Sequence, residues 1–466
     1  MLEPDICVIG GGSAGLTVAA AAASFGQGVV LVERGRMGGD CLNYGCVPSK
    51  SLIAAARHAH QGGAPFGVTG QADVDFKAVH DHVHGVITAI APHDSVERFE
   101  GLGVTVLEAE ARFVDETTIV AGQTRVRPRR FVIATGSRPV LPPIPGLADA
   151  APLTNESVFD LTRLPQRLVV IGAGPIGAEL GQAFARLGST VTLVSAEPLL
   201  AREDPDAAAV VRRHLAADGV TLIEGAAIES VQRADGTVTL ALKDGGTVTG
   251  DNLLVAAGRA PNTENLDLAA AGIATEHGAI TVDDRLRTTN RRAYAIGDVN
   301  GGLQFTHVAG HQASLVVRAI VFRLPARYDA DLMPHAIYTA PEIAAVGLGE
   351  ADARARYGHR ASVSTAPLAG NDRARTDAET DGFVKLVLGP GGKLVGATIV
   401  APHAGEMIAT YALALAGKVS LKTVASFTPA YPTYSEAGKR AAVSHFAKKL
   451  DSPWLRRILA LLKRLP

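Results

Sequence analysis

The stretch Ile6-Cys-Val-Ile-Gly-Gly-Gly-Ser-Ala-Gly15 decides the fold of this chain. Its four apolar residues predict a buried strand, the glycines Gly10, Gly12 and Gly15 predict a tight turn, and the alanine-rich run beyond them predicts a helix. Glycines at this spacing let backbone N–H groups and a helix N-terminus approach a pyrophosphate. The next strand ends at Glu33, whose carboxylate can accept from a ribose hydroxyl. We interpret the stretch as a dinucleotide-binding βαβ unit rather than a merely tight turn.

The same arrangement returns at Gly172, Gly174 and Gly177, so the chain is expected to bind two dinucleotides. The position equivalent to Glu33 is here Ser195, which would not repel the 2′-phosphate of NADP. No arginine adjoins it, however, and Glu197 follows two residues later. The pattern therefore leaves both NADH and NADPH open.

The order of predicted elements is that of an α/β protein with two Rossmann-like domains and a C-terminal α+β domain. Strand-and-glycine segments at Gly136 and Gly258 are expected to contribute to the two dinucleotide sites. The expected boundaries are 1–150 and 276–333 for the first Rossmann-like domain, 151–275 for the second, 334–450 for the α+β domain and 451–466 for a basic amphipathic tail.

Composition excludes several classes of function. The chain has 45 basic and 46 acidic residues, which argues against a nucleic-acid-binding surface. No apolar run reaches the roughly 18 residues that span a bilayer, and no secretory leader precedes the first strand. We therefore expect a cytoplasmic protein, in which a close cysteine pair is catalytic or metal-binding rather than structural.

Such a pair is formed by Cys41 and Cys46, within Gly38-Gly-Asp-Cys-Leu-Asn-Tyr-Gly-Cys-Val-Pro-Ser-Lys50. A distorted first helical turn can bring the two sulfurs together, and a helix N-terminus stabilises the reactive thiolate. The alternatives are two unrelated buried thiols or half of a metal site. The third cysteine, Cys7, lies in an apolar strand and is most simply core, so no bound metal is expected.

This cysteine segment resembles the redox-disulfide signature of the class I flavoprotein disulfide reductases, which include dihydrolipoamide dehydrogenase, glutathione reductase and mercuric reductase. The resemblance covers nearly the whole chain, including both glycine turns and the segment Tyr294–Asp298. It implies FAD in the first domain, NADH or NADPH in the second, and a homodimer formed through the third. It also implies that electrons pass from NAD(P)H through FAD to the disulfide and then to an acceptor.

The resemblance implies roles for individual residues. Cys41 would attack the outside substrate, and Cys46 would contact the flavin as a charge-transfer donor. Lys50, paired with Glu179, would stabilise negative charge on the reduced flavin, unless the two are simply solvated helix charges. Asp298 would bind the ribitol chain of FAD.

The chain departs from the family pattern near its end. Disulfide-reducing members carry His-Pro-Thr-x-x-Glu, contributed by the other subunit, and its histidine is the acid/base for substrate thiols. Here the segment is Tyr431-Pro-Thr-Tyr-Ser-Glu436. A phenol is a poor base at neutral pH, and loss of the histidine should lower thiol–disulfide turnover by about 10²–10⁴-fold. A tyrosine is the mercuric reductase pattern, although that branch's other cysteine pairs are absent.

The acceptor therefore stays open among a small molecule, a protein-bound lipoyl group and a metal ion. A metal-ion or quinone reductase needs no acid/base histidine, and a redox-responsive NAD(P)H-binding module is a non-catalytic alternative. His307 is a candidate replacement proton donor, or a histidine that only contacts the start of a helix.

The tail, residues 451–466, can form a helix with Trp454, Leu455, Ile458, Leu461, Leu462 and Leu465 on one face. Basic amphipathic helices bind anionic membranes or pack on protein surfaces. Both interpretations are kept as hypotheses.

Overall fold

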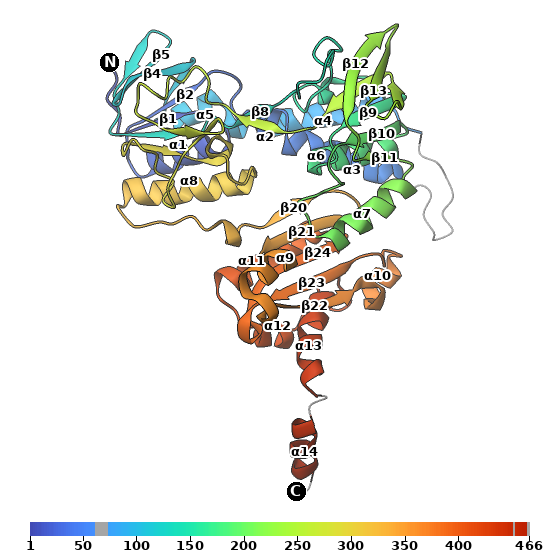
Figure 1. Cartoon of the computed structure of the whole chain (residues 1–466). Helices are drawn as coiled ribbons and strands as arrows, with labels where there is room; N and C mark the ends of the chain where they lie inside the picture. The colour runs from blue at the N-terminus through green and yellow to red at the C-terminus, as the bar shows by residue number, and fades with distance from the viewer. Residues whose placement is uncertain (61–72, 451–452, 464–466) are drawn as a thin grey trace. The chain divides into compact units, whose positions relative to one another are not determined.

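A computed structural model of the chain describes residues 1–60, 73–450 and 453–463 (Figure 1). Contacts group the chain into two compact units. The first unit consists mainly of residues 1–197 and 222–329, and the second unit of residues 198–221 and 330–466.

A five-stranded parallel sheet forms the centre of the first dinucleotide-binding region. Its strand order is β19-β7-β1-β2-β3, with bounds Ala293–Ala295, Arg130–Ile133, Ile6–Ile9, Val29–Glu33 and Thr105–Glu108. Helices α1 (Ser13–Ser24) and α8 (Thr306–Val321) pack together on one face (Figure 1). The other face packs on the antiparallel strands β4 (Ala111–Asp115), β5 (Thr118–Ala121) and β6 (Thr124–Val126). Cys7, on β1, is fully buried between the parallel sheet and these antiparallel strands.

A four-stranded parallel sheet forms the second dinucleotide-binding region. Its order is β11-β10-β9-β15, with bounds Thr221–Glu224, Thr190–Ser195, Arg167–Ile171 and Asn252–Val255. The antiparallel strands β12 (Ile228–Ala234), β13 (Thr237–Leu242) and β14 (Thr247–Gly250) pack against it. The remaining strands are β8 (Ser137–Pro139), β16 (Arg259–Pro261), β17 (Thr275–Glu276) and β18 (Ala279–Ile280). The remaining helices of this unit are α2 (Gly39–Asn43), α3 (Cys46–His60), α4 (Phe76–Ile90), α5 (Val96–Gly101) and α6 (Pro175–Arg186).

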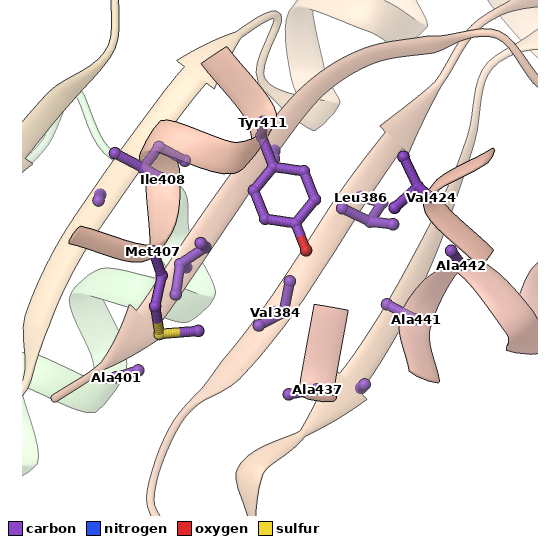
Figure 2. Close-up of a cluster of buried hydrophobic side chains, with 14 of the residues drawn as sticks. Val384, Leu386, Ala401, Met407, Ile408, Tyr411, Val424, Ala437, Ala441 and Ala442 are labelled. Carbon is purple, nitrogen blue, oxygen red and sulfur yellow. The ribbon is translucent and has the colours of Figure 1, made fainter. Parts of the chain in front are cut away.

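The second unit is built on a five-stranded antiparallel sheet in the order β20-β21-β24-β23-β22. The strands are His335–Ile337, Glu342–Gly347, Leu394–Ala401, Phe383–Leu388 and Ser362–Pro367. One face packs on helices α11 (Ala404–Ala416), α12 (Leu421–Ser426) and α13 (Glu436–Leu450). Figure 2 shows the buried cluster between them, with Met407, Ile408 and Tyr411 of α11 facing Val384 and Leu386 of β23. The predicted α/β and α+β architecture is confirmed.

The opposite face of this sheet carries an ion cluster around the buried Lys385. Helix α7 (Pro205–Ala217) begins beside β23, and α9 (Glu350–Tyr357) and α10 (Asp372–Thr376) complete the unit. The Lys385 side chain is only 5% exposed, and its Nζ lies 2.8 Å from Asp204 Oδ2, 2.7 Å from Asp206 Oδ2 and 3.3 Å from Glu350 Oε2. Burial lowers the pKa of Lys385, but the bonds to Asp204 and Asp206 outweigh it and raise the pKa. This cluster helps to explain why residues 198–221, inside the range predicted for the NAD(P)-binding domain, group with the second unit.

The tail contains helix α14 (Pro453–Leu462), which exposes Trp454, Leu461 and Leu462. The predicted apolar face is therefore helical over most of its length, although Leu465 and the side chain of Leu455 lie outside the described residues. Among the described residues, no helix is both long enough and apolar enough to cross a membrane.

Candidate active site

The first glycine turn leaves no room for side chains. A Cβ on Gly10, where φ is +108°, would lie 2.3 Å from the backbone oxygen of Ala134, and a Cβ on Gly15 would lie 1.9 Å from the oxygen of Gly10. This close packing sets the N-terminus of α1 directly after β1. The carboxylate of Glu33 accepts hydrogen bonds from the backbone N–H groups of Gly11 and Gly35 at the same edge. The backbone N–H groups of the turn and the absence of side chains there fit the pyrophosphate of a dinucleotide, and the Glu33 carboxylate fits its ribose.

The second glycine turn repeats this geometry. A Cβ on Gly172 would lie 2.5 Å from the oxygen of Ala256, and one on Gly177 would lie 1.9 Å from the oxygen of Gly172, whereas a Cβ on Gly174 would meet nothing within 4 Å. Ser195 ends β10 and is buried, and its Oγ accepts the N–H of Glu197 at 3.2 Å. This turn also fits a dinucleotide, and the exposed Glu197 lies two residues beyond Ser195.

The segments that contain Gly136 and Gly258 pair with each other, as β8 and β16. The pairing brings Arg259 Nε within 2.8 Å of Ser137 Oγ, which in turn donates to Asp298 Oδ2 at 2.5 Å. Burial raises the pKa of Asp298 despite these neighbours. Ser137 and Arg259 were not among the predicted site residues, because Ser137 lies 161 residues from Asp298 and 122 residues from Arg259 along the chain.

The two cysteines come from different helices. Cys41 lies in α2, which ends at Asn43, and Cys46 is the first residue of α3. The expected distorted turn is thus a full break between two helices, with Gly45 in the gap. Both thiols are reduced, and the hydrogen bond between them shifts their pKa values in opposite directions.

That bond lowers the pKa of Cys46 to about 6 and raises the pKa of Cys41 well above its ordinary value. Thr306, at the start of α8, adds to the effect on Cys46, with its Oγ1 at 3.6 Å from the Cys46 sulfur. Positive charge on Lys50 lowers the pKa further. Cys46 is therefore the thiolate of the pair at neutral pH, and Cys41 is the thiol.

Lys50 lies one helical turn beyond Cys46, and its Nζ contacts Glu179 Oε2 at 2.7 Å. Glu179 stands on α6, just after the second glycine turn, with 7% of its side chain exposed against 33% for Lys50. The pair therefore joins the helix that carries the cysteine to the helix of the second dinucleotide turn.

His307 follows Thr306 on α8, is exposed, and stacks on Phe305 with a ring-centroid distance of 5.5 Å. It thus lies one residue from the side chain that contacts Cys46. Thr306 itself was missed by the sequence reasoning, which weighed only the histidine beside it.

Tyr431 and Glu436 lie in the second unit. Tyr431 is 71% exposed and donates to Asp372 Oδ2 at 3.2 Å, a bond that raises the pKa of the phenol. Glu436 begins α13, and its carboxylate accepts from the backbone N–H of Thr433. The Tyr431 hydroxyl is consequently protonated at neutral pH.

Comparisons with known proteins agree with this geometry. The model of the pyridine nucleotide-disulphide oxidoreductases matches residues 4–313, and the model of the dimerisation domain of the same family matches residues 333–442. The second match supports a homodimer.

Curated relatives include a mercuric reductase of Acidithiobacillus ferrooxidans, 38% identical over 94% of this chain and 82% of its own length. A dihydrolipoyl dehydrogenase of Haloferax volcanii is 36% identical over 94% of this chain and 95% of its own.

Among solved structures, a Cu(II) complex of the HOCl-induced flavoprotein disulfide reductase RclA from Escherichia coli is 29% identical, with a TM-score of 0.84 over 93% of this chain and 98% of that one. LpdA from Mycobacterium tuberculosis is 29% identical, with a TM-score of 0.85 over 95% and 99%. The chain belongs to the pyridine nucleotide-disulphide oxidoreductase family and is an FAD-dependent NAD(P)H oxidoreductase with a redox-active cysteine pair.

Proposed function

We propose that this enzyme uses NAD(P)H to reduce a thiophilic metal ion, such as Cu²⁺ or Hg²⁺, at Cys41 and Cys46. The observation that carries the proposal is Tyr431, whose phenol is kept protonated by Asp372 at the position where disulfide-reducing relatives have a basic histidine. Metal ions need no proton from such a base, whereas a disulfide acceptor does. Soft thiolates are also the ligands that Hg²⁺ and reduced copper prefer.

The residues proposed to hold the cofactors follow from the two glycine turns. Gly10, Gly12, Gly15, Glu33, Gly136 and Asp298 would hold FAD, and Gly172, Gly174, Gly177, Ser195 and Gly258 would hold the pyridine nucleotide. Bound FAD supplies the two-electron carrier between the pyridine nucleotide and the cysteine pair. Lys50 would place a positive charge beside that carrier, and Glu179 holds the ammonium in position and offsets its burial.

The cysteines have distinct proposed roles. Cys46 is already a thiolate near neutral pH and binds the metal ion without help from a base. Cys41 loses its proton to solvent as it becomes the second ligand. Two Cu²⁺ ions each take one electron, the two thiolates form the Cys41–Cys46 disulfide, and two Cu⁺ ions leave. NAD(P)H then supplies the two electrons that return the disulfide to the dithiol.

Steady-state assays of the FAD-loaded enzyme test this proposal with Cu²⁺, Hg²⁺, lipoamide, glutathione disulfide and a quinone. We expect metal reduction to exceed disulfide reduction and to be lost in Cys46→Ser. Tyr431→Phe should leave metal reduction within about twofold, and Tyr431→His should raise disulfide reduction by about 10²-fold, since it supplies a base.

Three outcomes would contradict the proposal. Wild-type enzyme that reduces lipoamide faster than either metal ion would favour a disulfide acceptor. Metal reduction that survives Cys46→Ser would place the chemistry at the flavin alone, as expected for quinone reduction. If every acceptor failed while NAD(P)H still bound, the protein would be a redox-responsive binding module.

A second candidate is a dihydrolipoyl-type reaction on a small or protein-bound lipoyl group, favoured by the position of His307. This imidazole, one residue from the Thr306 contact to Cys46, would replace Tyr431 as the acid/base. His307→Ala should then abolish lipoamide turnover and change the shape of its pH profile. Unchanged turnover would exclude this role.

The donor is proposed to be NADH. Ser195 Oγ is occupied by the N–H of Glu197, and the exposed Glu197 carboxylate would accept from ribose hydroxyls but repel a 2′-phosphate. Glu197→Arg should shift the ratio of kcat/KM values toward NADPH by about tenfold or more. Glu197→Gln is the matched control for loss of charge alone. A wild-type preference for NADPH would refute this assignment.

In the proposed homodimer, Tyr431 and Glu436 complete the partner's site, and the enzyme is proposed to act in the cytoplasm. The basic helix α14, with Trp454, Leu461 and Leu462 exposed, is proposed to rest on anionic membrane surfaces. Liposome flotation with and without residues 451–466 tests this contact. Equal flotation of the two proteins would exclude it.

A further inference from the structure

A cluster of arginines surrounds a cavity at the amino ends of the first parallel sheet. The cavity has a volume of about 240 Å³, and five arginines but only one carboxylate line it. The arginines are Arg129, Arg130, Arg285, Arg287 and Arg323, and the carboxylate is Asp5. The lining therefore carries a formal excess of four positive charges inside a chain whose net charge is −1.

Most of this charge has no counterpart within the described residues. Arg129 pairs with Asp5 at 2.8 Å. No carboxylate of the described chain forms an ion pair with the other four arginines, and the nearby Asp284 pairs with Arg327 instead. Such unpaired guanidinium groups repel one another, and a bound anion would relieve the repulsion.

One of the arginines has a buried donor atom that a bound anion would satisfy. The Nε of Arg287 is buried with no hydrogen-bond partner in the described structure, and its guanidinium lies 5.9 Å from the ring centre of Tyr294. Buried polar atoms ordinarily have partners.

The electrostatics of Arg130 agree with this picture. Burial lowers the pKa of its guanidinium, and neighbouring positive groups, Arg323 first among them, lower it further. Among the residues that the structure describes, its side chain donates only to the backbone oxygen of Arg129.

The cavity is separate from the proposed cofactor site. Asp5 and Arg130 stand at the amino ends of β1 and β7, which run parallel in register, whereas Gly10 and Ala134 follow their carboxyl ends. Four residues at about 3.3 Å each put roughly 13 Å between the two ends of the sheet. Dinucleotides bind at the carboxyl ends of such strands.

We propose that this cavity binds a small diphosphate-bearing molecule. Planar guanidinium forks match phosphate oxygens in pairs, and two linked phosphates carry enough charge to balance the unpaired arginines, which one carboxylate does not. The apolar residues Ile320, Leu324 and Pro325 on the wall can also accept an attached ring. Free pyrophosphate and a nucleoside diphosphate share this chemistry.

Calorimetric titration of the FAD-loaded enzyme at constant ionic strength tests the proposal, with pyrophosphate as the probe and sulfate as the competitor that controls for nonspecific binding. The variant Arg285→Gln/Arg323→Gln removes two exposed guanidinium groups of the cavity. The control Arg112→Gln/Arg127→Gln removes equal charge from exposed arginines that pair with carboxylates elsewhere in the same unit. NADH-dependent turnover should be unchanged in both.

We expect saturable pyrophosphate binding in the wild type and the control, and an affinity at least about tenfold weaker in the cavity variant. A titration with ADP distinguishes free pyrophosphate from a nucleoside diphosphate as the ligand. If the site binds a nucleoside diphosphate, ADP should bind more tightly than pyrophosphate, and the ADP affinity should fall in the cavity variant. Four results would overturn the proposal. They are the absence of saturable pyrophosphate binding, displacement of pyrophosphate by equimolar sulfate, equal weakening of pyrophosphate affinity in both variants, and full pyrophosphate binding in the cavity variant. The last result would place the anion at a glycine turn.

Discussion

Cys46 is expected to be a thiolate at neutral pH because Cys41 donates a hydrogen bond to it. In the reduced protein this bond is the largest cause of the depressed pKa of Cys46, which lies at about 6. A hydrogen bond to a charged acceptor contributes about 1.5–3 kcal/mol, and one pKa unit corresponds to about 1.4 kcal/mol. The variant Cys41→Ala should therefore raise the pKa of Cys46 by about one to two units.

The assay is alkylation of the reduced, FAD-loaded enzyme by iodoacetamide at a series of pH values, with each cysteine peptide quantified by mass spectrometry. Only the thiolate reacts, so the rate at Cys46 should rise with pH through a midpoint near 6 in the wild type. The midpoint should move upward in Cys41→Ala. Cys41 should stay unreactive in the wild type, and the buried Cys7 is an internal control in every sample.

A smaller upward shift is expected in Thr306→Val, because the threonine hydroxyl is a lesser cause of the same depression. Equal reactivity of the two active-site cysteines would refute the assignment of thiol and thiolate. So would a wild-type midpoint near that of a free cysteine, about 8.5, or an unchanged midpoint in Cys41→Ala.

Three further predictions follow from single contacts. Glu179→Gln removes the counter-charge of Lys50 and should slow reduction of the disulfide by NADH about tenfold or more in stopped-flow measurements, without loss of NADH binding. Gly177→Ala should lower the free energy of unfolding by about 1–3 kcal/mol and abolish NADH binding in calorimetry, whereas Gly174→Ala, with open space around its Cβ, should leave stability unchanged but weaken NADH binding, because the second glycine of the motif lets the backbone approach the pyrophosphate. Lys385→Met leaves the buried Asp204 carboxylate without its lysine partner and should cost about 3–5 kcal/mol of stability in urea denaturation; a loss below about 1 kcal/mol would show that this ion pair is solvated.

The sequence by itself determined the local parts of this protein. Glycine spacing encodes a strand-to-helix turn because the steric conflict is between residues only a few positions apart, as between Gly10 and Gly15. The cysteine pair and Tyr431 could likewise be identified from the sequence, because each belongs to a short continuous segment that specifically resembles one family.

Only the tertiary structure decided which distant groups meet. The Thr306 contact to Cys46, the Ser137 bond to Asp298 and the ion cluster around Lys385 join segments that lie far apart along the chain. The arginine cavity likewise gathers side chains from several separate segments. These contacts depend on strand order and register, which place the ends of non-consecutive strands side by side. The spacing of residues along the chain does not encode that strand order. The residues that contact the cysteine pair, and the arginine cavity, could therefore be identified only from the fold.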